Sequence, residues 1–385
     1  MEFSFYTANK IVFKKNAIDE LAEHIRPLNG TQYLLVIDPA FYQTDVMDRI
    51  LGQIKKLGAG CTVFHETSGE PTVDLVDSVH TMAKEDGCDA VISVGGGTCI
   101  DIGKAVSATL TNGIPSVDYL EYVGNGKKVV NHPVPFVTCP TTAGTGSEVT
   151  KNAVLGSTTQ NFKRSMRSDM MVADISIIDP TLTINCPPKV TAYSGIDAMT
   201  HLIEAYTTFR ATPISDGLSR KGIGLAGKYL KRAVKNGKND YEAREGMSAA
   251  ALLGGMAFAN SGLGAAHGIG MAIGIRYHVA HGRACGILLP HVVKLNSDVA
   301  MERLDIVGEE LTGKHFDKKG EGTEAAINFL FDLNKEIGVE YDYKFLNIPE
   351  SELMDIAQQS IGTSMKSNPK PMDQQSIYNF LKTIC

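Results

Sequence analysis

The chain has 385 residues, of which 43% are hydrophobic and 21% charged, and its formal net charge is −6. This length exceeds what one hydrophobic core usually serves, and the composition is typical of folded proteins, so we expect two domains and exclude a largely disordered chain. The mild charge, without runs of Lys and Arg among aromatic residues, excludes a nucleic-acid partner, and no apolar stretch of about 18 residues predicts a membrane span.

The cysteines and the N-terminal residues indicate the compartment. Seven cysteines are scattered along the chain and none belongs to a CxxC pair, which argues against a disulfide framework and against a thiolate zinc site. The first residues, MEFSFYTANKIVFKK, lack the basic-then-apolar order of a signal peptide. We therefore expect a protein of the reducing cytoplasm.

The first half of the chain alternates short apolar runs with helical patterns, from Tyr33 to about Asp179. Alternation of strands with helices of 10 to 15 residues predicts a parallel sheet that helices cover on both faces. The strands are expected at YLLVID (33–38), CTVFHE (61–66) and DAVISVGGG (89–97), and the helices at 45–58 and 73–87.

The second half carries helix-period apolar faces instead, in segments 191–209, 216–234 and 241–259. The run Cys186-Pro187-Pro188 cannot continue a helix or a central strand, so we place the hinge there. The sequence thus predicts an α/β domain at 1–187 and a helical domain at 188–385.

Two segments of the first half suit a nucleotide. In VGGGTCIDIGKA (94–105), three glycines after a strand let backbone N–H groups approach a pyrophosphate, beside the N-terminus of the next helix. The spacing is not G-x-G-x-x-G, because Ile100 stands where the last glycine would be. The alternative is that the three glycines form a turn that binds no ligand. CPTTAGTGSEVTKN (139–152) adds small hydroxyl residues suited to phosphate and ribose, so together the segments predict a nucleotide site.

Asp38 ends the first predicted strand, in VIDPAF. An acidic residue there can accept hydrogen bonds from an adenosine ribose and would repel a 2′-phosphate, which favours NAD over NADP. The alternative is that an Asp before Pro simply starts a turn.

Four residues of the second half could hold a metal ion. Asp197 and His201 are four apart in a helical pattern and share one face, as either a chelating pair or a surface hydrogen bond. On one straight helix His267 and His281 would be about 21 Å apart, so a shared ion requires the chain to turn back between them. Three imidazoles and a carboxylate suit Fe²⁺, Zn²⁺, Co²⁺ or Mn²⁺, without selecting one.

The motifs GGGTCID, TTAGTGSEVTKN, GIDAMTHLIEAY and HGIGMAIGIRYHVAHG resemble the iron-containing (group III) alcohol dehydrogenases, which include lactaldehyde reductase, 1,3-propanediol dehydrogenase and 4-hydroxybutyrate dehydrogenase. The resemblance implies the dehydroquinate synthase-like architecture, an α/β dinucleotide-binding domain followed by an all-α metal-binding domain. It also implies NAD(H), one Fe²⁺ or Zn²⁺, reversible reduction of a short-chain aldehyde to a primary alcohol, and a dimer or larger homo-oligomer.

The family's functional positions carry over onto residues of this chain. The resemblance implies that the metal ligands, which act in catalysis through the ion, are Asp197, His201, His267 and His281. It implies that the cofactor side, to which we add Asp38, comprises Gly95, Gly96, Gly97, Thr98, Asp101, Thr141, Thr142, Thr145 and Lys163.

Two positions depart from the family pattern. Family members commonly have a second histidine four residues after the third ligand, where it helps to relay a proton, and this chain has Met271 there. A water chain or a ribose hydroxyl would then have to protonate the alkoxide, unless the substrate supplies different chemistry. In SGEPT, Glu70 occupies a position that is typically Asn, which affects cofactor contacts.

The substrate is expected to be an aldehyde with an anionic tail, such as sulfoacetaldehyde, succinic semialdehyde or phosphonoacetaldehyde, because a guanidinium suits such anions. Alternatively the arginines are solvated or bind cofactor phosphates, and the chain is a general short-chain alcohol or diol dehydrogenase. A non-redox lyase of the same architecture and an inactive binding homologue are further alternatives. The arginines are Arg164, Arg167, Arg276 and Arg283, and Asn152 and Met271 are also expected on the substrate side.

Overall fold

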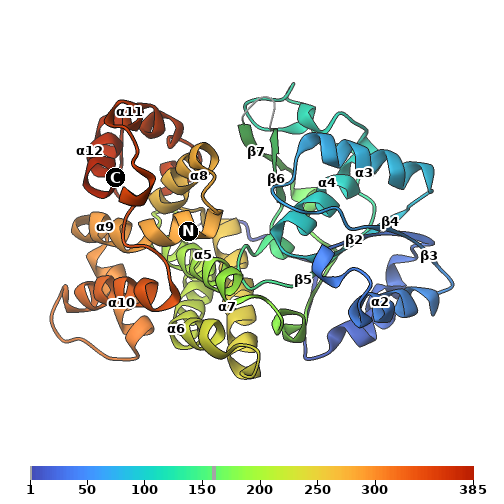
Figure 1. The fold of residues 1–385 in the computed structure, drawn as a ribbon, viewed down its shortest axis with the longest axis horizontal. Coiled ribbons are helices and arrows are strands. Elements are labelled where there is room, and N and C mark those ends of the chain that lie inside the picture. The colour runs from blue at the N-terminus through green and yellow to red at the C-terminus, as the bar shows by residue number, and fades with distance from the viewer. Residues whose placement is uncertain (1, 158–161) are drawn as a thin grey trace. The chain divides into compact units, whose positions relative to one another are not determined.

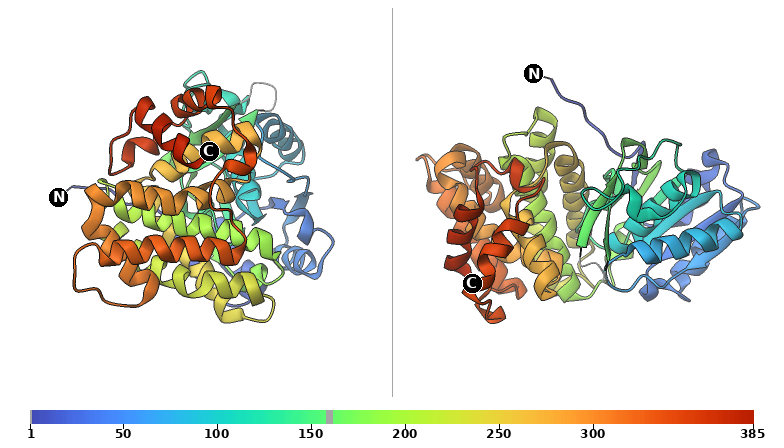
Figure 2. Two further views of the ribbon diagram at one scale, coloured as in Figure 1. Left: turned by 60° about the vertical axis from the view of Figure 1, so that its left-hand side comes forward. Right: turned by 90° about the horizontal axis from the view of Figure 1, so that it is seen from above.

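The computed structural model describes residues 2–157 and 162–385, and Figures 1 and 2 show its two compact units. The sheet unit comprises Tyr6–Thr142 and Gly146–Thr183. The helical unit comprises Ile184–Cys385, together with Ala143–Thr145 and the described residues up to Phe5. Each unit is described by itself below.

The sheet unit is built on a six-stranded sheet of order β1-β8-β5-β4-β2-β3, in which every neighbouring pair is parallel. This confirms the predicted parallel sheet. Its central strands are almost continuously apolar and buried, as expected where helices cover both faces. The strands are β1 (Lys10–Phe13), β2 (Gln32–Ile37), β3 (Gly60–Phe64), β4 (Ala90–Gly95), β5 (Phe136–Pro140) and β8 (Ile175–Ile178).

Helices cover both faces of this sheet, with α2 on one side and α3 and α4 on the other (Figure 1). The predicted helices at 45–58 and 73–87 are confirmed as α2 (Asp45–Lys55) and α3 (Val73–Glu85), and α4 (Gly97–Asn112) follows the glycine triplet. The short α1 (Leu21–Ile25) packs beside α2.

The strand order creates a switch point between β2 and β4. The chain leaves β2 through α2 to reach β3 on one side, and leaves β4 through α4 to reach β5 on the other. At the carboxyl ends of two such strands the connections diverge, and sheets of this kind bind ligands in the gap. Asp38 and Gly96, which directly follow β2 and β4, both lie there.

The sequence did not predict the antiparallel hairpin of β6 (Asn152–Ser157) and β7 (Phe162–Arg167), which follows the hydroxyl-rich segment. Lys104 on α4 anchors this region, because its buried ammonium donates to the backbone oxygens of Ser147 and Asn152, at 2.7 and 2.9 Å, and to the Thr150 hydroxyl at 3.0 Å. Burial lowers the pKa of Lys104 to about 8, and Asp101 opposes that shift.

The helical unit contains only helices and loops among its described residues, as predicted. The predicted segments at 191–209 and 216–234 begin earlier than expected, because Pro188 and Pro213 occupy the first helical turn, where a missing N–H costs nothing. The helices are α5 (Pro188–Thr207), α6 (Pro213–Asn236), α7 (Tyr241–Ser261), α8 (Ala265–Tyr277), α9 (His281–Thr312), α10 (Glu321–Ile337), α11 (Glu350–Gln359) and α12 (Gln374–Ile384).

Helix α5 is the core of this unit. Every residue from Gly195 to Thr207 is buried, and α6, α7 and α9 pack around the helix. A helix that is buried on all sides normally carries apolar residues only. The buried Asp197, His201 and Glu204 of α5 are therefore exceptions that need partners.

The turn that the two distant histidines required is present between α8 and α9. Helix α8 ends at Tyr277, His278 adopts a left-handed conformation with φ 53°, and α9 begins at His281. Gly282 permits the return, because a Cβ there would lie 2.1 Å from the backbone oxygen of Tyr193 on α5. This close approach brings His281 beside α5.

Among the described residues, no single helix has both the length and the apolar character to cross a membrane. Helices α7 and α8 satisfy these criteria only as a pair, with a bend of 101° between them.

Replacing Lys104 by Met is expected to destabilise the protein by about 3 kcal/mol or more, because it leaves Asp101 without its buried counter-charge and several oxygens without a donor. Urea unfolding followed by far-UV circular dichroism measures the loss. The control is Lys56→Met on the exposed surface after α2. Equal unfolding midpoints for the two variants would contradict this role.

Candidate functional site

The candidate metal cage begins on one face of α5. Asp197, His201 and Glu204 are spaced i, i+4 and i+7, so their side chains project from the same side of the helix. All three are at most 4% exposed. The ring of His201 stacks on Phe258 of α7, with centroids 4.4 Å apart, which fixes its orientation.

Helices α8 and α9 bring the other two predicted ligands to this face. The Nε2 atoms of His267 and His281 lie 3.5 and 3.7 Å from Asp197 Oδ1, and His201 Nε2 lies 3.9 Å from Asp197 Oδ2. The His201 and His267 rings stack with centroids 4.6 Å apart. The structure therefore brings together all four side chains that the sequence proposed as ligands.

Glu204 orients His267 from behind. The Nδ1 atom of His267 donates to Glu204 Oε2 at 2.6 Å, which leaves Nε2 to face Asp197. The other carboxylate oxygen accepts the backbone N–H of Ala266 at 2.7 Å, at the start of α8, where Gly264 provides no side-chain cap. Carboxylates that fix a histidine in this way are typical of metal sites.

The sequence analysis missed Glu204, although a signal was present. In GIDAMTHLIEAY the acidic residue falls on the same stripe as Asp197 and His201, in a segment that is otherwise apolar. Three polar residues at i, i+4 and i+7 in such a helix indicate a buried polar cluster.

The groups of the cage shift each other's pKa values. Burial alone would raise the pKa of Asp197, but the imidazoles of His201, His281 and His267 hold it well below its usual range. Burial lowers the pKa of His201 to about 3, against the attraction of Asp197. At neutral pH His201 is therefore uncharged and Asp197 is ionised, as a metal ion requires of these two ligands. Burial alone would lower the pKa of His267, but Cys285, Glu204 and Asp197 raise it overall.

The donor atoms fit a divalent cation. Asp197 Oδ1 and His267 Nε2 are buried and have no hydrogen-bond partner among the residues that the structure describes. Buried polar atoms are rarely left unsatisfied, and these two face each other across 3.5 Å. An ion between them would satisfy both, and imidazole nitrogen with carboxylate oxygen suits Fe²⁺ or Zn²⁺.

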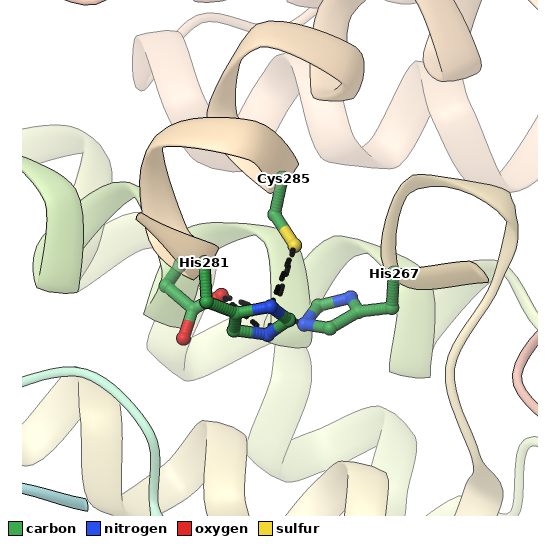
Figure 3. Close-up of side chains that lie close together, drawn as sticks. His267, His281 and Cys285 are labelled. Carbon is green, nitrogen blue, oxygen red and sulfur yellow. Dashed lines mark hydrogen bonds and ion pairs between the residues drawn. The ribbon is translucent and has the colours of Figure 1, made fainter. Parts of the chain in front are cut away.

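A sulfur atom that the sequence did not single out also faces the cage. Cys285 lies one turn after His281 on α9 and points toward the His281 and His267 rings (Figure 3). Burial alone would raise the pKa of its thiol, but His267 and His281 lower it overall. The spacing of four between His281 and Cys285 places both on one face of a helix and is a signal in the sequence, although Cys285 belongs to no CxxC pair.

The second candidate site is a hollow at the switch point of the sheet unit, with a volume of about 390 Å³. One oxygen of Asp38 accepts the N–H of Ala40 at 2.9 Å, which fixes the carboxylate in the wall of the hollow. The lining residues are Asp38, Pro39, Thr67, Ser68, Gly69, Gly96, Thr98 and Cys99.

The glycine triplet and the hydroxyl-rich segment meet beside this hollow. Thr141 donates its N–H to the Gly95 oxygen at 3.0 Å, and a Cβ on Gly96 would lie 3.4 Å from the Thr142 hydroxyl. Gly97 is the first residue of α4, so the helix N-terminus adjoins the hollow. Thr145 belongs to the helical unit instead.

Two predicted cofactor residues have protein partners. Asp101 is buried and accepts from the Ser147 hydroxyl at 2.5 Å and the Val154 N–H at 3.0 Å, so in this structure it anchors the segment that leads into β6. Lys163 forms an ion pair with Glu70, the residue that departs from the family pattern, at 2.7 Å.

Arg276, which was expected to bind an anionic substrate, has partners within the protein. Arg276 pairs with Glu352 at 2.7 Å and with Asp355, both on α11. Two carboxylates of α11 therefore orient the Arg276 guanidinium in this structure.

The other candidate substrate residues also have protein contacts. Arg283 pairs with Glu340, and Arg167 pairs with Glu121 at 3.2 Å. Arg164 donates to the Lys163 backbone oxygen at 3.2 Å.

Asn152 is the first residue of β6 and lies opposite Arg167, and its backbone oxygen accepts a hydrogen bond from Lys104. Met271 is partly buried on α8, one turn after His267.

Two family models match consecutive parts of the chain. Residues 8–180 match the family described as iron-containing alcohol dehydrogenase, and residues 191–385 match the Fe-containing alcohol dehydrogenase family, C-terminal.

Individual relatives extend over nearly the whole chain. A sulfoacetaldehyde reductase of Bilophila wadsworthia (strain 3_1_6) is 32% identical, with 99% of each chain covered. An NAD-dependent methanol dehydrogenase of Bacillus methanolicus is 30% identical, with 98% of this chain and 99% of the relative covered. The crystal structure of a 1,3-propanediol oxidoreductase, 30% identical, superimposes with a TM-score of 0.94 and full coverage of both chains.

Replacing Glu204 by Gln is expected to weaken Zn²⁺ binding by about 10- to 100-fold, because the carboxylate that orients His267 is lost. Competition with a chromophoric chelator measures the affinity. The control is Glu242→Gln, which removes an exposed carboxylate paired with Arg232 on the surface of the same unit. Unchanged affinity in the Glu204 variant would contradict this positioning role.

Proposed function

Since the chain belongs to the iron-containing alcohol dehydrogenase family, we propose that it reversibly reduces an uncharged short-chain aldehyde to a primary alcohol with NAD(H). That it is an NAD-dependent, metal-containing alcohol dehydrogenase rests on the family and its relatives. The observation that carries the proposed site is the cage, in which Asp197 meets three imidazoles and buried donor atoms lack partners.

Each part of the two sites has a proposed task. A divalent ion in the cage would supply Lewis-acid polarisation of the substrate oxygen. Asp197 balances the positive charge there, and Glu204 keeps His267 in the tautomer that directs Nε2 inward. In the sheet unit the N-terminus of α4 and the Gly96 backbone would receive the pyrophosphate, while Asp38 would accept from the adenosine ribose.

Met271 affects how the product alkoxide receives its proton. Its thioether has no proton to donate, so no side chain at that position can relay one. We therefore propose that water or a cofactor hydroxyl protonates the product. The thioether also makes this face of α8 less polar, which favours a substrate with an uncharged tail.

The charge of the substrate follows from the arginines. Arg276, Arg283 and Arg167 each pair with a carboxylate of their own unit, so three of the four arginines that suggested an anionic aldehyde already have a counter-charge. Arg164 instead donates to the Lys163 backbone oxygen. We therefore propose an uncharged short-chain aldehyde as the substrate. The methanol dehydrogenase relative acts on an uncharged alcohol, which agrees with this choice.

An anionic aldehyde remains the second candidate because relatives of this chain include sulfoacetaldehyde reductases. The sulfoacetaldehyde reductase of Bilophila wadsworthia aligns over 99% of this chain. If the substrate of this chain carries a sulfonate, it must be bound by a group other than the paired arginines above.

Fe²⁺ and Zn²⁺ are both proposed as the ion, since imidazole and carboxylate donors accept either. The proposed assembly is a homo-oligomer in the cytoplasm, which rests on the family resemblance and on the cysteine pattern.

Anaerobic NADH oxidation by the Fe²⁺- or Zn²⁺-loaded protein tests the substrate. We expect kcat/KM for propanal to equal or exceed the values for sulfoacetaldehyde and succinic semialdehyde. A preference of tenfold or more for an anionic aldehyde, about 1.4 kcal/mol, would overturn the choice.

Replacing Arg276 by Met is expected to change KM for propanal and for sulfoacetaldehyde by the same factor, because its partners are Glu352 and Asp355 and not the substrate. Steady-state kinetics of both substrates measures the two factors. Arg220→Met, which breaks a surface pair with Glu310, is the matched control. A rise in KM confined to sulfoacetaldehyde would restore the anionic candidate.

Replacing Glu70 by Gln is expected to tighten NADH binding by about two- to fivefold, because it frees Lys163 for the cofactor and removes a negative charge near an anionic ligand. Fluorescence titration with NADH measures this. The matched control is Glu121→Gln, which frees Arg167 in the same unit. Weaker NADH binding in the Glu70 variant would show that the carboxylate itself contacts the cofactor.

A further inference from the structure

Cys285 is a fifth potential donor at the cage, beyond the four ligands of the proposed function. Its Sγ lies 3.8 Å from His281 Nε2, and the side chain is fully buried. One donor atom from each of Asp197, His267, His281 and Cys285 lies within 4.8 Å of every other. Figure 3 shows the sulfur directed from α9 toward the two imidazoles.

The carboxylate of Asp197 has two differently placed oxygens. Oδ1 faces His267 and His281, on the side that Cys285 shares, whereas Oδ2 faces His201. Oδ1 and His267 Nε2 are both buried and have no hydrogen-bond partner among the described residues, and both residues are only 2% exposed. These two unsatisfied atoms lie on the sulfur side of the carboxylate.

The spacing of these atoms suits a tetrahedral ion. With bonds of about 2.0–2.1 Å to nitrogen or oxygen and about 2.3 Å to sulfur, tetrahedral ligands lie roughly 3.3–3.6 Å apart. The separations from Asp197 Oδ1 to His267, from Asp197 Oδ1 to His281, and from His281 to Cys285 are 3.5, 3.7 and 3.8 Å. Small rotations of the side chains would close the difference.

The sulfur has room because Gly270 faces it. A Cβ at Gly270 would lie 3.1 Å from Cys285 Sγ, closer than side chains normally pack. Since α8 carries no side chain at that point, the sulfur sits between α8 and the cage without being pushed aside.

We propose that Cys285 is a thiolate ligand of zinc in this chain, and that with Zn²⁺ it replaces His201 as the fourth ligand beside Asp197, His267 and His281. The inference rests on the proposed metal cage. When the zinc–sulfur bond forms, the thiol S–H bond breaks and its proton passes to solvent. A thiolate is a soft donor, so this arrangement favours Zn²⁺ over the harder Fe²⁺, for which His201 is the fourth ligand.

The consequence is a distinction between the two metal forms. Four protein ligands complete a tetrahedral zinc site, so a substrate oxygen would have to join as a fifth ligand. We therefore expect the zinc form to turn over more slowly than the iron form. The absence of CxxC pairs in the sequence argued against a zinc site made of cysteines alone. It does not argue against a site in which one thiolate joins histidine ligands.

X-ray absorption spectroscopy of the Zn²⁺-loaded full-length protein tests this proposal. We expect one sulfur neighbour per zinc at about 2.3 Å, absent in Cys285→Ala and retained in Cys139→Ala, which removes a buried cysteine of the sheet unit. A wild-type spectrum with nitrogen and oxygen neighbours only would overturn the sulfur ligand while the cage stands. Failure of wild type to retain zinc would overturn both.

Two further readouts protect the test from folding artefacts. Co²⁺-loaded wild type should show near-ultraviolet sulfur-to-cobalt absorption, which Cys285→Ser should lose while it keeps the far-UV circular dichroism of wild type. Zn²⁺ binding to metal-free protein should release one more proton from wild type than from Cys285→Ser. Identical cobalt spectra and equal proton release for the two proteins would each contradict the proposal.

Discussion

The carboxylate of Asp197 is the constraint on which the helical unit depends. It is buried, ionised and surrounded by imidazoles, and one of its oxygens has no hydrogen-bond partner in the described chain. A buried charge of this kind is costly unless an opposite charge meets it. The packing around it follows from that need: α5 carries the carboxylate, Gly282 lets α9 approach, and Glu204 fixes His267 at the start of α8.

The sheet unit obeys a separate constraint, the divergence of connections after β2 and β4. That divergence creates the hollow beside Asp38 and Gly96 whatever side chains line it, and the α4 N-terminus supplies the positive end of a helix. The buried Lys104 then holds the segment that follows the hydroxyl-rich run. Its role is structural, although the charge lies close to residues expected to meet the cofactor.

Sequence patterns predicted those features of the fold and of the metal site that depend on the spacing of residues along the chain. Alternating strands and helices indicated the parallel sheet, and the separation of His267 from His281 required a turn that exists at His278. Pairings between distant elements were not predictable in this way: Arg276 meets carboxylates of α11, about 75 residues further along, and Lys163 meets Glu70. Nothing in a linear spacing shows that a guanidinium is already paired, so the sequence alone suggested more arginines for an anionic substrate than the structure leaves without a carboxylate partner.

The most direct test of the account is the metal content of purified protein after removal of loosely bound ions, comparing wild type with Asp197→Asn. The substitution keeps the shape of the side chain and removes the charge that the cage is built around. We expect a single divalent ion per wild-type chain and none retained by the variant, with similar far-UV circular dichroism. Equal retention by both proteins, or no ion in wild type, would contradict it.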